Sequence, residues 1–369
     1  MEYVTLNNGI KMPKLGYGVY QTPAGDTRRC VLDAIDVGYR SIDTAQAYYN
    51  EEGVGEALAE SGLPREEFFL TTKVWITNAG YEKAKASIEE SMRKLRTDYL
   101  DLLLIHQPFG DYYGTYRAME ELYKAGRLRA IGVSNFGPDR YLDIQHFAEV
   151  KPAVNQIETH VFQQQKTAKE YLKKYGCQIE SWGPFAEGRK DMFTNPVLTQ
   201  IGEKYGKTAA QTALRFLLQS DVVVIPKSTH KDRMQQNFDL FDFTLTAEDM
   251  AAIEALDGGE SLFFSHYDPK TVEWFMSHRL LHHAHGQMQF PAPSLLLKNC
   301  GPWHEAQKPL LRYKQRLLRK PWQSSEPQDC LPELIILVYA YDSSFFTLME
   351  APSPNGRMEV SSSGLCFSS

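Results

Sequence analysis

The chain of 369 residues is 43% apolar and 23% charged, the composition of a globular protein with enough apolar residues for a large core. Its net charge of −6, without a concentrated basic stretch, argues against a nucleic-acid-binding protein. We expect no signal peptide and, without a run of about 18 apolar residues, no membrane-spanning helix. The five cysteines form neither a metal-binding pattern nor a disulfide framework, which favours a reduced, cytoplasmic setting.

The first predicted element is a short hairpin over residues 3–13, YVTLNNGIKMP, with Asn-Asn-Gly at its turn. Eight short runs follow, rich in Val, Ile and Leu, and they are typical of strands buried on both faces. These runs cover residues 14–20, 39–45, 68–74, 99–106, 128–135, 152–158, 177–183 and 222–228.

Amphipathic segments between these runs predict helices over residues 81–96, 114–126, 137–150, 208–219 and 246–257. Eight strand–helix units predict an α/β fold, a closed (β/α)8 TIM barrel with the N-terminal β-hairpin at its bottom. The alternative is an open doubly wound sheet with a glycine-rich nucleotide turn. It is disfavoured because GYGVYQ (16–21) lacks a third glycine and a convincing helix start, and GVGEAL (53–58) lies inside a helix.

Residues 281–369 differ in composition from the rest of the chain. They contain nine of the nineteen prolines and three of the five cysteines. We therefore predict a barrel domain over 1–280 and a C-terminal extension of uncertain structure, mostly disordered, over 281–369. The extension lacks a sustained pattern apart from the apolar segment 331–341, and it contains a basic, weakly amphipathic segment at 310–322. The nearby histidines 278, 282, 283 and 285 lack partnering carboxylates or cysteines, so we predict no metal site.

Several predicted strands end in a polar residue, and in a barrel such residues meet at one mouth. Asp43, Lys73 and His106 end successive strands, and Ser134, Asn135, Gln156 and Glu158 end the next two. Each alone has an ordinary explanation, such as a helix cap or a lysine that reaches water. Together they favour catalysis at a carbonyl group. A lysine would lower the pKa of a tyrosine acid, an aspartate would hold the lysine, and a histidine would orient the substrate.

Residues 38–51, GYRSIDTAQAYYNE, resemble the signature of the aldo-keto reductase family, Gly-x-Arg-x-x-Asp-Thr-Ala-x-x-Tyr-x-Asn-Glu. The alignment implies that Tyr48 is the acid and that Tyr49 stands where the family often has glycine. LTTKVW (70–75) and LLLIHQP (102–108) resemble the segments that supply the lysine and the histidine. The resemblance therefore implies a catalytic tetrad of Asp43, Tyr48, Lys73 and His106.

The resemblance also implies a site for NADPH. GVSNF (132–136) and NQIETH (155–160) would supply Ser134, Asn135 and Gln156 to the nicotinamide amide, and SWGPFAEG (181–188) would supply Trp182 as the stacking ring. IPKSTHKDRMQQNF (225–238) resembles the segment that binds the 2′-phosphate and adenine, with the residues Lys227, Ser228, Arg233, Gln236 and Asn237. Alone, that segment is more typical of a solvated basic helix face. The resemblance reverses this preference and favours NADPH over NADH.

The resemblance spans about residues 3–280 and is greatest to compact prokaryotic reductases of small aldehydes, diketones and sugar-derived carbonyls. Two departures are Gln107, where tryptophan is frequent, and valine after His160, where proline is common. Tyr20, Trp75 and Phe109 are candidate walls of the substrate pocket, although aromatic residues there also suit a core.

We therefore predict a monomeric, NADPH-dependent reductase of small aldehydes and ketones, with a small-molecule carbonyl substrate and no nucleic-acid or membrane partner. One alternative is an NADPH-binding sensor or structural protein of the same fold with little turnover. Another is a metal-dependent hydrolase or phosphate-binding isomerase. A hydrolase needs several His and carboxylate ligands at strand ends, where His106 is the one histidine found.

Overall fold

The computed structural model describes residues 1–278. The features predicted for residues 281–369, including the segments 310–322 and 331–341, lie outside the described residues. The side chains of the histidine cluster at 278–285 lie outside them as well.

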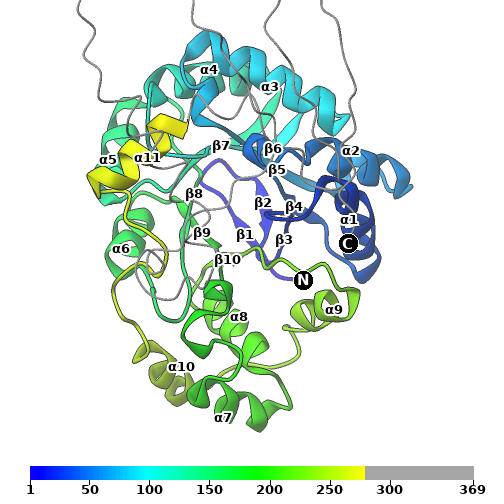
Figure 1. Cartoon of the computed structure of the whole chain (residues 1–369), viewed down its shortest axis with the longest axis vertical. Helices are drawn as coiled ribbons and strands as arrows, with labels where there is room; N and C mark the ends of the chain where they lie inside the picture. The colour runs from blue at the N-terminus through cyan, green and yellow to red at the C-terminus, as the bar shows by residue number, and fades with distance from the viewer. Residues whose placement is uncertain (279–369) are drawn as a thin grey trace, which may run out of the picture. The chain divides into compact units, whose positions relative to one another are not determined.

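Eight parallel strands form the centre of the described structure, in the spatial order β3 to β10 (Figure 1). Their bounds are β3 Tyr17–Gly18, β4 Ser41–Asp43, β5 Phe69–Val74, β6 Leu100–Ile105, β7 Leu128–Ser134, β8 Val154–Glu158, β9 Gln178–Trp182 and β10 Val223–Val224. A parallel bridge between Leu15 and Val224 joins the first strand to the last. The Gly18 amide also donates to the Pro226 carbonyl over 3.3 Å. These contacts close the sheet into the predicted (β/α)8 barrel.

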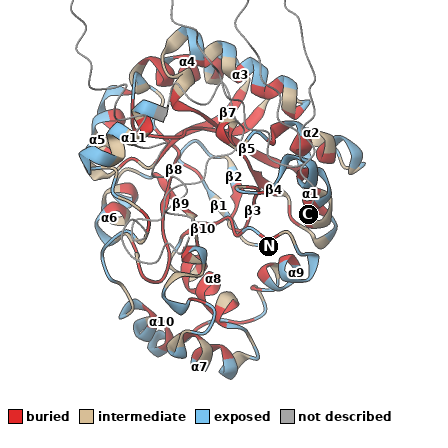
Figure 2. Cartoon of the chain, viewed as in Figure 1, coloured by how far each residue is buried: buried red, intermediate tan, exposed pale blue. Residues whose placement is uncertain are grey.

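The helices surround the strands and turn their buried faces toward them (Figure 2). Their bounds are α1 Ala24–Val37, α2 Glu51–Glu60, α3 Tyr81–Leu95, α4 Tyr112–Lys124, α5 Pro138–Phe147, α6 Lys166–Lys174, α7 Pro196–Tyr205, α8 Ala209–Gln219, α9 Lys231–Phe238, α10 Ala247–Glu254 and α11 Pro269–His278. The apolar face predicted for α3 is buried, including Ile88 and Leu95. At the start of α10, Thr246 and Asp249 form a reciprocal capping box.

The predicted hairpin consists of β1 Tyr3–Thr5 and β2 Lys11–Pro13, which pair antiparallel. Leu6 and Met12 pack against interior strand residues such as Phe69 and Leu102. The Asn7 side chain donates to the Pro152 carbonyl, just before β8 begins. The hairpin therefore covers the amino ends of the strands, which leaves the carboxyl ends as the open mouth.

Two details of the sequence analysis are wrong. A helix does follow residues 16–21, because α1 begins at Ala24 directly after Pro23 and buries Cys30 and Val31. Pro23 supplies the fixed backbone angle that a helix start tolerates and is the local sequence signal for this helix. The first and last strands are also shorter than predicted; β10 ends before Pro226, which has no N–H for the sheet.

The close approach of β7 and β8 predicts a specific stability defect. A Cβ atom added to Gly132 would lie 2.3 Å from the Val154 carbonyl oxygen, so Gly132→Ala should force the strands apart. We expect a loss of about 1–3 kcal/mol in the free energy of unfolding, measured by chemical denaturation. The control is Gly25→Ala, where an added Cβ meets no atom within 4 Å. Equal stability of the two variants would contradict this account of the packing.

Candidate active site

A cavity of about 710 Å³ opens among the residues at the carboxyl ends of the strands. Its lining combines ionisable, amide and aromatic side chains from most of the strands and from the segment after α10. They include Tyr20, Asp43, Tyr48, Trp75, His106, Gln107, Ser134, Asn135, Gln156, Trp182, Lys227, Phe263 and Phe264. The structure therefore brings most of the predicted site residues to one mouth.

The Lys73 ammonium lies at the centre of this group and is fully buried. It donates to Asp43 Oδ1 over 2.6 Å, to the Thr44 carbonyl over 2.9 Å and to the Tyr48 hydroxyl over 3.3 Å. An ammonium has three hydrogens, so these three acceptors satisfy it completely. Since the Tyr48 oxygen accepts from Lys73, its own proton remains to be donated elsewhere.

Tyr48 ends a short 3-10 helix, Gln46–Tyr48, that carries its ring toward Lys73. Burial, followed by the charges of Asp43 and Glu180, raises the pKa of Tyr48 well above its usual value of 10. The expectation that the ammonium would bring this pKa down is wrong, because burial and the two carboxyl groups shift it upward. The phenol is therefore protonated throughout the neutral range.

Tyr49 adopts a left-handed backbone with φ of 55° and is 45% exposed. This conformation favours glycine, which accounts for the family's frequent glycine at this position. The two neighbouring tyrosines are thus separated by the backbone, with one ring beside Lys73 and the other exposed.

His106 is buried beside Tyr48, with its ring centroid 5.5 Å from that of the tyrosine in an edge-to-face arrangement. Burial and the charge of Lys73 lower the pKa of His106 well below 6.5, so its ring is neutral. Its Nδ1 atom has no hydrogen-bond partner among the described residues. A neutral imidazole at the cavity wall can donate one hydrogen bond to a carbonyl oxygen.

Four predicted cofactor residues form a connected layer beside the tetrad. The Asn135 amide donates to the His106 carbonyl and to Ser134, while its oxygen accepts from Trp182 Nε1 over 2.8 Å. Asn135 has a φ of 65°, which asparagine tolerates better than most residues. The Gln156 amide donates deeper into the barrel, to Asp43 and to Glu180. This layer offers amide groups and an indole face to a planar ring.

The predicted phosphate-binding residues lie near the start of α9. Lys227 lines the cavity, and Ser228 accepts from the His230 amide over 3.1 Å. His230 precedes α9 without a side-chain cap, so the first amides of this helix remain available to an anion. Arg233 is exposed and forms no ion pair with another described residue, and of the predicted adenine residues Gln236 is exposed and Asn237 is buried.

Of the three predicted pocket walls, Tyr20 and Trp75 line the cavity. Phe109 is not among its lining residues. It packs behind Trp75 in an aromatic cluster with Phe275, whose ring centroid lies 5.5 Å from that of Phe109. Phe109 therefore supports the wall from behind.

Sequence reasoning missed a polar pair at the mouth, formed by Gln107 and His266. The two side chains form a hydrogen bond of 2.8 Å across 159 residues of sequence. Gln107 lines the cavity directly after His106. Gln107 is visible in the sequence as a departure from the frequent tryptophan, but its partner His266 lies in a loop that no local pattern marks.

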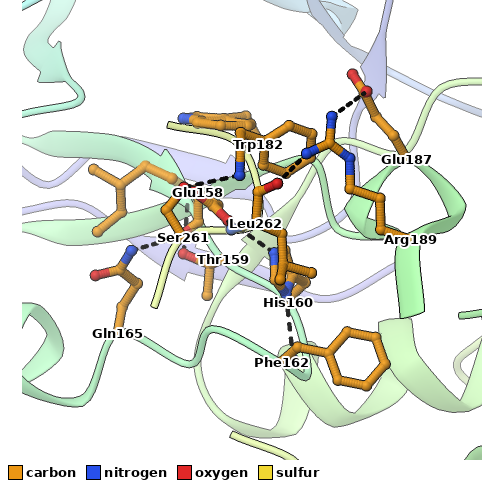
Figure 3. Close-up of polar contacts among 12 residues, drawn as sticks. Glu158, Thr159, His160, Phe162, Gln165, Trp182, Glu187, Arg189, Ser261 and Leu262 are labelled. Carbon is orange, nitrogen blue, oxygen red and sulfur yellow. Dashed lines mark hydrogen bonds and ion pairs between the residues drawn. The ribbon is translucent and has the colours of Figure 1, made fainter. Parts of the chain in front are cut away.

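Glu158, at the end of β8, anchors the segment after α10 (Figure 3). Its carboxylate accepts from the Ser261 hydroxyl and the Leu262 amide and contacts His160. Arg189 in turn donates to the Leu262 carbonyl. The Glu158 carboxylate, which the sequence grouped with the catalytic candidates, therefore positions the loop that carries Phe263 and Phe264 into the cavity wall.

Fold and site together define a barrel enzyme with a buried Asp–Lys–Tyr–His group beside a site for a planar ring. A family model described as "Aldo/keto reductase family" matches residues 12–258, and the chain belongs to this family. The predictions of an oxidoreductase of this family, and of the NADPH that the family uses, are thereby confirmed.

Three similar proteins support this assignment. The chain is 49% identical over 259 residues to glyoxal reductase of Bacillus subtilis (strain 168), with 70% of this chain and 93% of the relative covered. It is similar to MGS-M4, an aldo-keto reductase from a Medee basin deep-sea metagenome library, with TM-score 0.71, 42% identity and coverage of 72% and 98%. A Gox0644 mutant in complex with NADPH has TM-score 0.68, 40% identity and coverage of 72% and 96%.

Two further findings concern residues 1–278. No helix in this range is long and apolar enough to cross a membrane. Within the same residues, no group of three or more His, Cys, Asp or Glu side chains is arranged to hold a metal ion.

His266 should make stability depend on pH. Burial lowers its pKa from 6.5 to about 4, so between these values the unfolded chain binds a proton that the folded protein does not. Stability should therefore fall as the pH drops from 6.5 to 4, by up to about 3 kcal/mol from this residue. Denaturant unfolding of the His266→Gln variant should show a shallower decline than wild type over this range. Parallel curves would contradict a neutral, partly buried imidazole.

Proposed function

We propose that the protein reduces small aldehydes and ketones to alcohols with NADPH, with Tyr48 as the general acid. The observation that carries this proposal is the contact in which the Tyr48 oxygen accepts a hydrogen bond from buried Lys73. It leaves the phenol proton free to be donated and places a positive charge where the phenolate forms.

When bound, NADPH would supply the hydride that adds to the carbonyl carbon. His106 donates a hydrogen bond to the carbonyl oxygen and orients it. As negative charge develops on that oxygen, Tyr48 transfers its proton to it, which yields the alcohol and a phenolate held by Lys73. An alkoxide is far more basic than a phenolate, so this transfer is favourable even from a phenol whose pKa is raised. Asp43 keeps the ammonium in place.

The chain's own residues suit such a cofactor. Ser134, Asn135 and Gln156 would hold the nicotinamide amide, and the Trp182 indole would stack on its ring. Lys227, Ser228 and Arg233 would bind the 2′-phosphate at the open start of α9, where the helix dipole favours an anion. Gln236 and Asn237 would lie near the adenine.

The substrate class follows from the cavity and from a relative. Tyr20, Trp75 and Phe264 provide apolar walls, and Gln107 adds a polar group beside His106. The Bacillus subtilis relative is a glyoxal reductase. We therefore propose small α-dicarbonyls and simple aldehydes as substrates. We further propose a cytoplasmic monomer whose reductase domain ends near residue 280.

Replacement of Tyr48 tests the acid directly. Tyr48→Phe should lower kcat for methylglyoxal by about 10²–10⁴-fold because the proton donor is lost. The Kd for NADPH, measured by fluorescence titration, should change little because the ring remains. The control is Tyr49→Phe, which changes the adjacent exposed tyrosine and should keep wild-type turnover.

Undiminished turnover in the Tyr48→Phe variant would refute the assignment of the acid. If wild type binds NADPH but oxidises it with none of methylglyoxal, a diketo sugar acid or an aromatic aldehyde, the protein is instead a nucleotide-binding sensor.

Replacement of Arg233 tests the phosphate site. Arg233→Gln should raise the KM for NADPH by about 10- to 100-fold, the value of a hydrogen bond between charged groups, and leave the KM for NADH unchanged. Lys231→Gln is the matched control, because Lys231 is two residues away but pairs with Asp36. Equal effects of the two substitutions on NADPH would contradict a specific role for Arg233.

A further inference from the structure

A second carboxyl group lies in the barrel interior next to the tetrad. The Gln156 amide nitrogen donates to Asp43 Oδ2 over 2.9 Å and to Glu180 Oε2 over 2.8 Å. Gln156 and Glu180 are direct partners in the pairing of β8 with β9. Glu180 therefore belongs to the same buried layer as Asp43 and Lys73, although it does not line the cavity.

The two carboxyl groups determine how the Gln156 amide is oriented. Asp43, which is paired with the Lys73 ammonium, can only accept hydrogen bonds, so the NH2 end of the Gln156 amide must face it. The second hydrogen of that NH2 group is then donated to Glu180 Oε2, an acceptor that an uncharged carboxylic acid also offers. The amide oxygen is then the polar atom left for the cavity, which Gln156 lines. That oxygen can accept from the amide of a nicotinamide.

The layer holds one cation for two carboxyl groups. The three N–H groups of Lys73 donate to Asp43, Thr44 and Tyr48, and Lys73 forms no ion pair with Glu180. Within residues 1–278, Glu180 forms no ion pair with any cation. A second carboxylate here would be buried and uncompensated, which is strongly unfavourable.

We propose that Glu180 is a positioning residue of this reductase. As an uncharged acid it holds the Gln156 amide in the orientation that the cofactor requires. Because it carries no charge, Asp43 is the one carboxylate beside the Lys73 ammonium. This inference rests on the proposed function for its catalytic consequence. Its structural part, the neutral acid and the oriented amide, stands without it.

The electrostatics of the layer support this role. Burial, with the charge of Asp43 as the next cause, raises the pKa of Glu180 to about 8. The ionisable groups that act on it are Asp43 on β4, Lys73 on β5 and Tyr48, while its partner on β10 is the apolar Val223. Above that pH a second negative charge forms beside Tyr48 and opposes the charge that develops during reduction. Carbonyl reduction should therefore decline as the pH rises through about 8.

The first experiment measures kcat/KM for methylglyoxal with NADPH between pH 6 and 9.5. The kcat/KM of wild type should fall about tenfold across an inflection near pH 8. The Glu180→Gln variant cannot ionise at this position, so its kcat/KM should show no such inflection. At pH 7 its kcat/KM should stay within about threefold of the wild-type value. Glu51→Gln is the control, since Glu51 is a buried carboxyl that accepts from Thr72 outside the cavity, and it should keep the inflection. An unchanged inflection in Glu180→Gln overturns the proposal.

The second experiment does not depend on turnover. Glu180→Ala should weaken NADPH binding about tenfold because Gln156 loses one of its two acceptors, and Glu180→Gln, whose side-chain oxygen can still accept, should restore it. As the pH rises from 4.5 to 8, the unfolding midpoint of Glu180→Gln should increase relative to that of wild type. In wild type, Glu180 stays protonated in the folded state but ionises in the unfolded state over this range, which destabilises the folded state. Parallel unfolding curves overturn the neutral acid even if no aldehyde is reduced.

Discussion

One buried ammonium group organises the mouth of this barrel. Lys73 has no exposed surface, so its charge must be compensated by protein atoms alone. Its three acceptors come from the end of β4, the residue after it and the short helix that follows. The pairing of β4 with β5 places these atoms within reach, with Asp43 opposite Thr71. The arrangement of Asp43, Thr44 and Tyr48 around Lys73 is therefore required to bury the ammonium charge, as well as for the proposed catalysis.

The same burial acts in opposite directions on the groups around Lys73. It removes the proton from His106 and keeps it on Tyr48 and Glu180, because a buried site favours the neutral form of each. The group of side chains around Lys73 thus contains one charged pair, Asp43 with Lys73, beside three groups that stay uncharged at neutral pH. Of these three groups, Tyr48 is the one that lines the cavity and also accepts a hydrogen bond from the Lys73 ammonium.

Local pattern was enough to predict the barrel, the hairpin and the strand-end residues. Strands of a parallel barrel point their ends to one mouth, so a polar residue after an apolar run can be placed without knowing its partners. Contacts between distant segments could not be predicted in this way. Glu180 lies inside an apparently ordinary strand, and its importance depends on Gln156 and Asp43, which are 24 and 137 residues away in the chain. Gln107 likewise depends on His266.

The residues that carry out proton transfer and the residues that contact the substrate belong to different parts of the fold. The residues that handle the proton lie on strand ends or one turn beyond them, and buried hydrogen bonds hold them in place. The walls that meet the substrate come largely from loops, and Phe263 and Phe264 are held by the contacts of Glu158 and Arg189 with Ser261 and Leu262. Loops tolerate change that a buried charge does not. The type of reaction can accordingly be predicted from the residues at the strand ends. The specificity for one carbonyl compound depends instead on a loop that the strands only anchor.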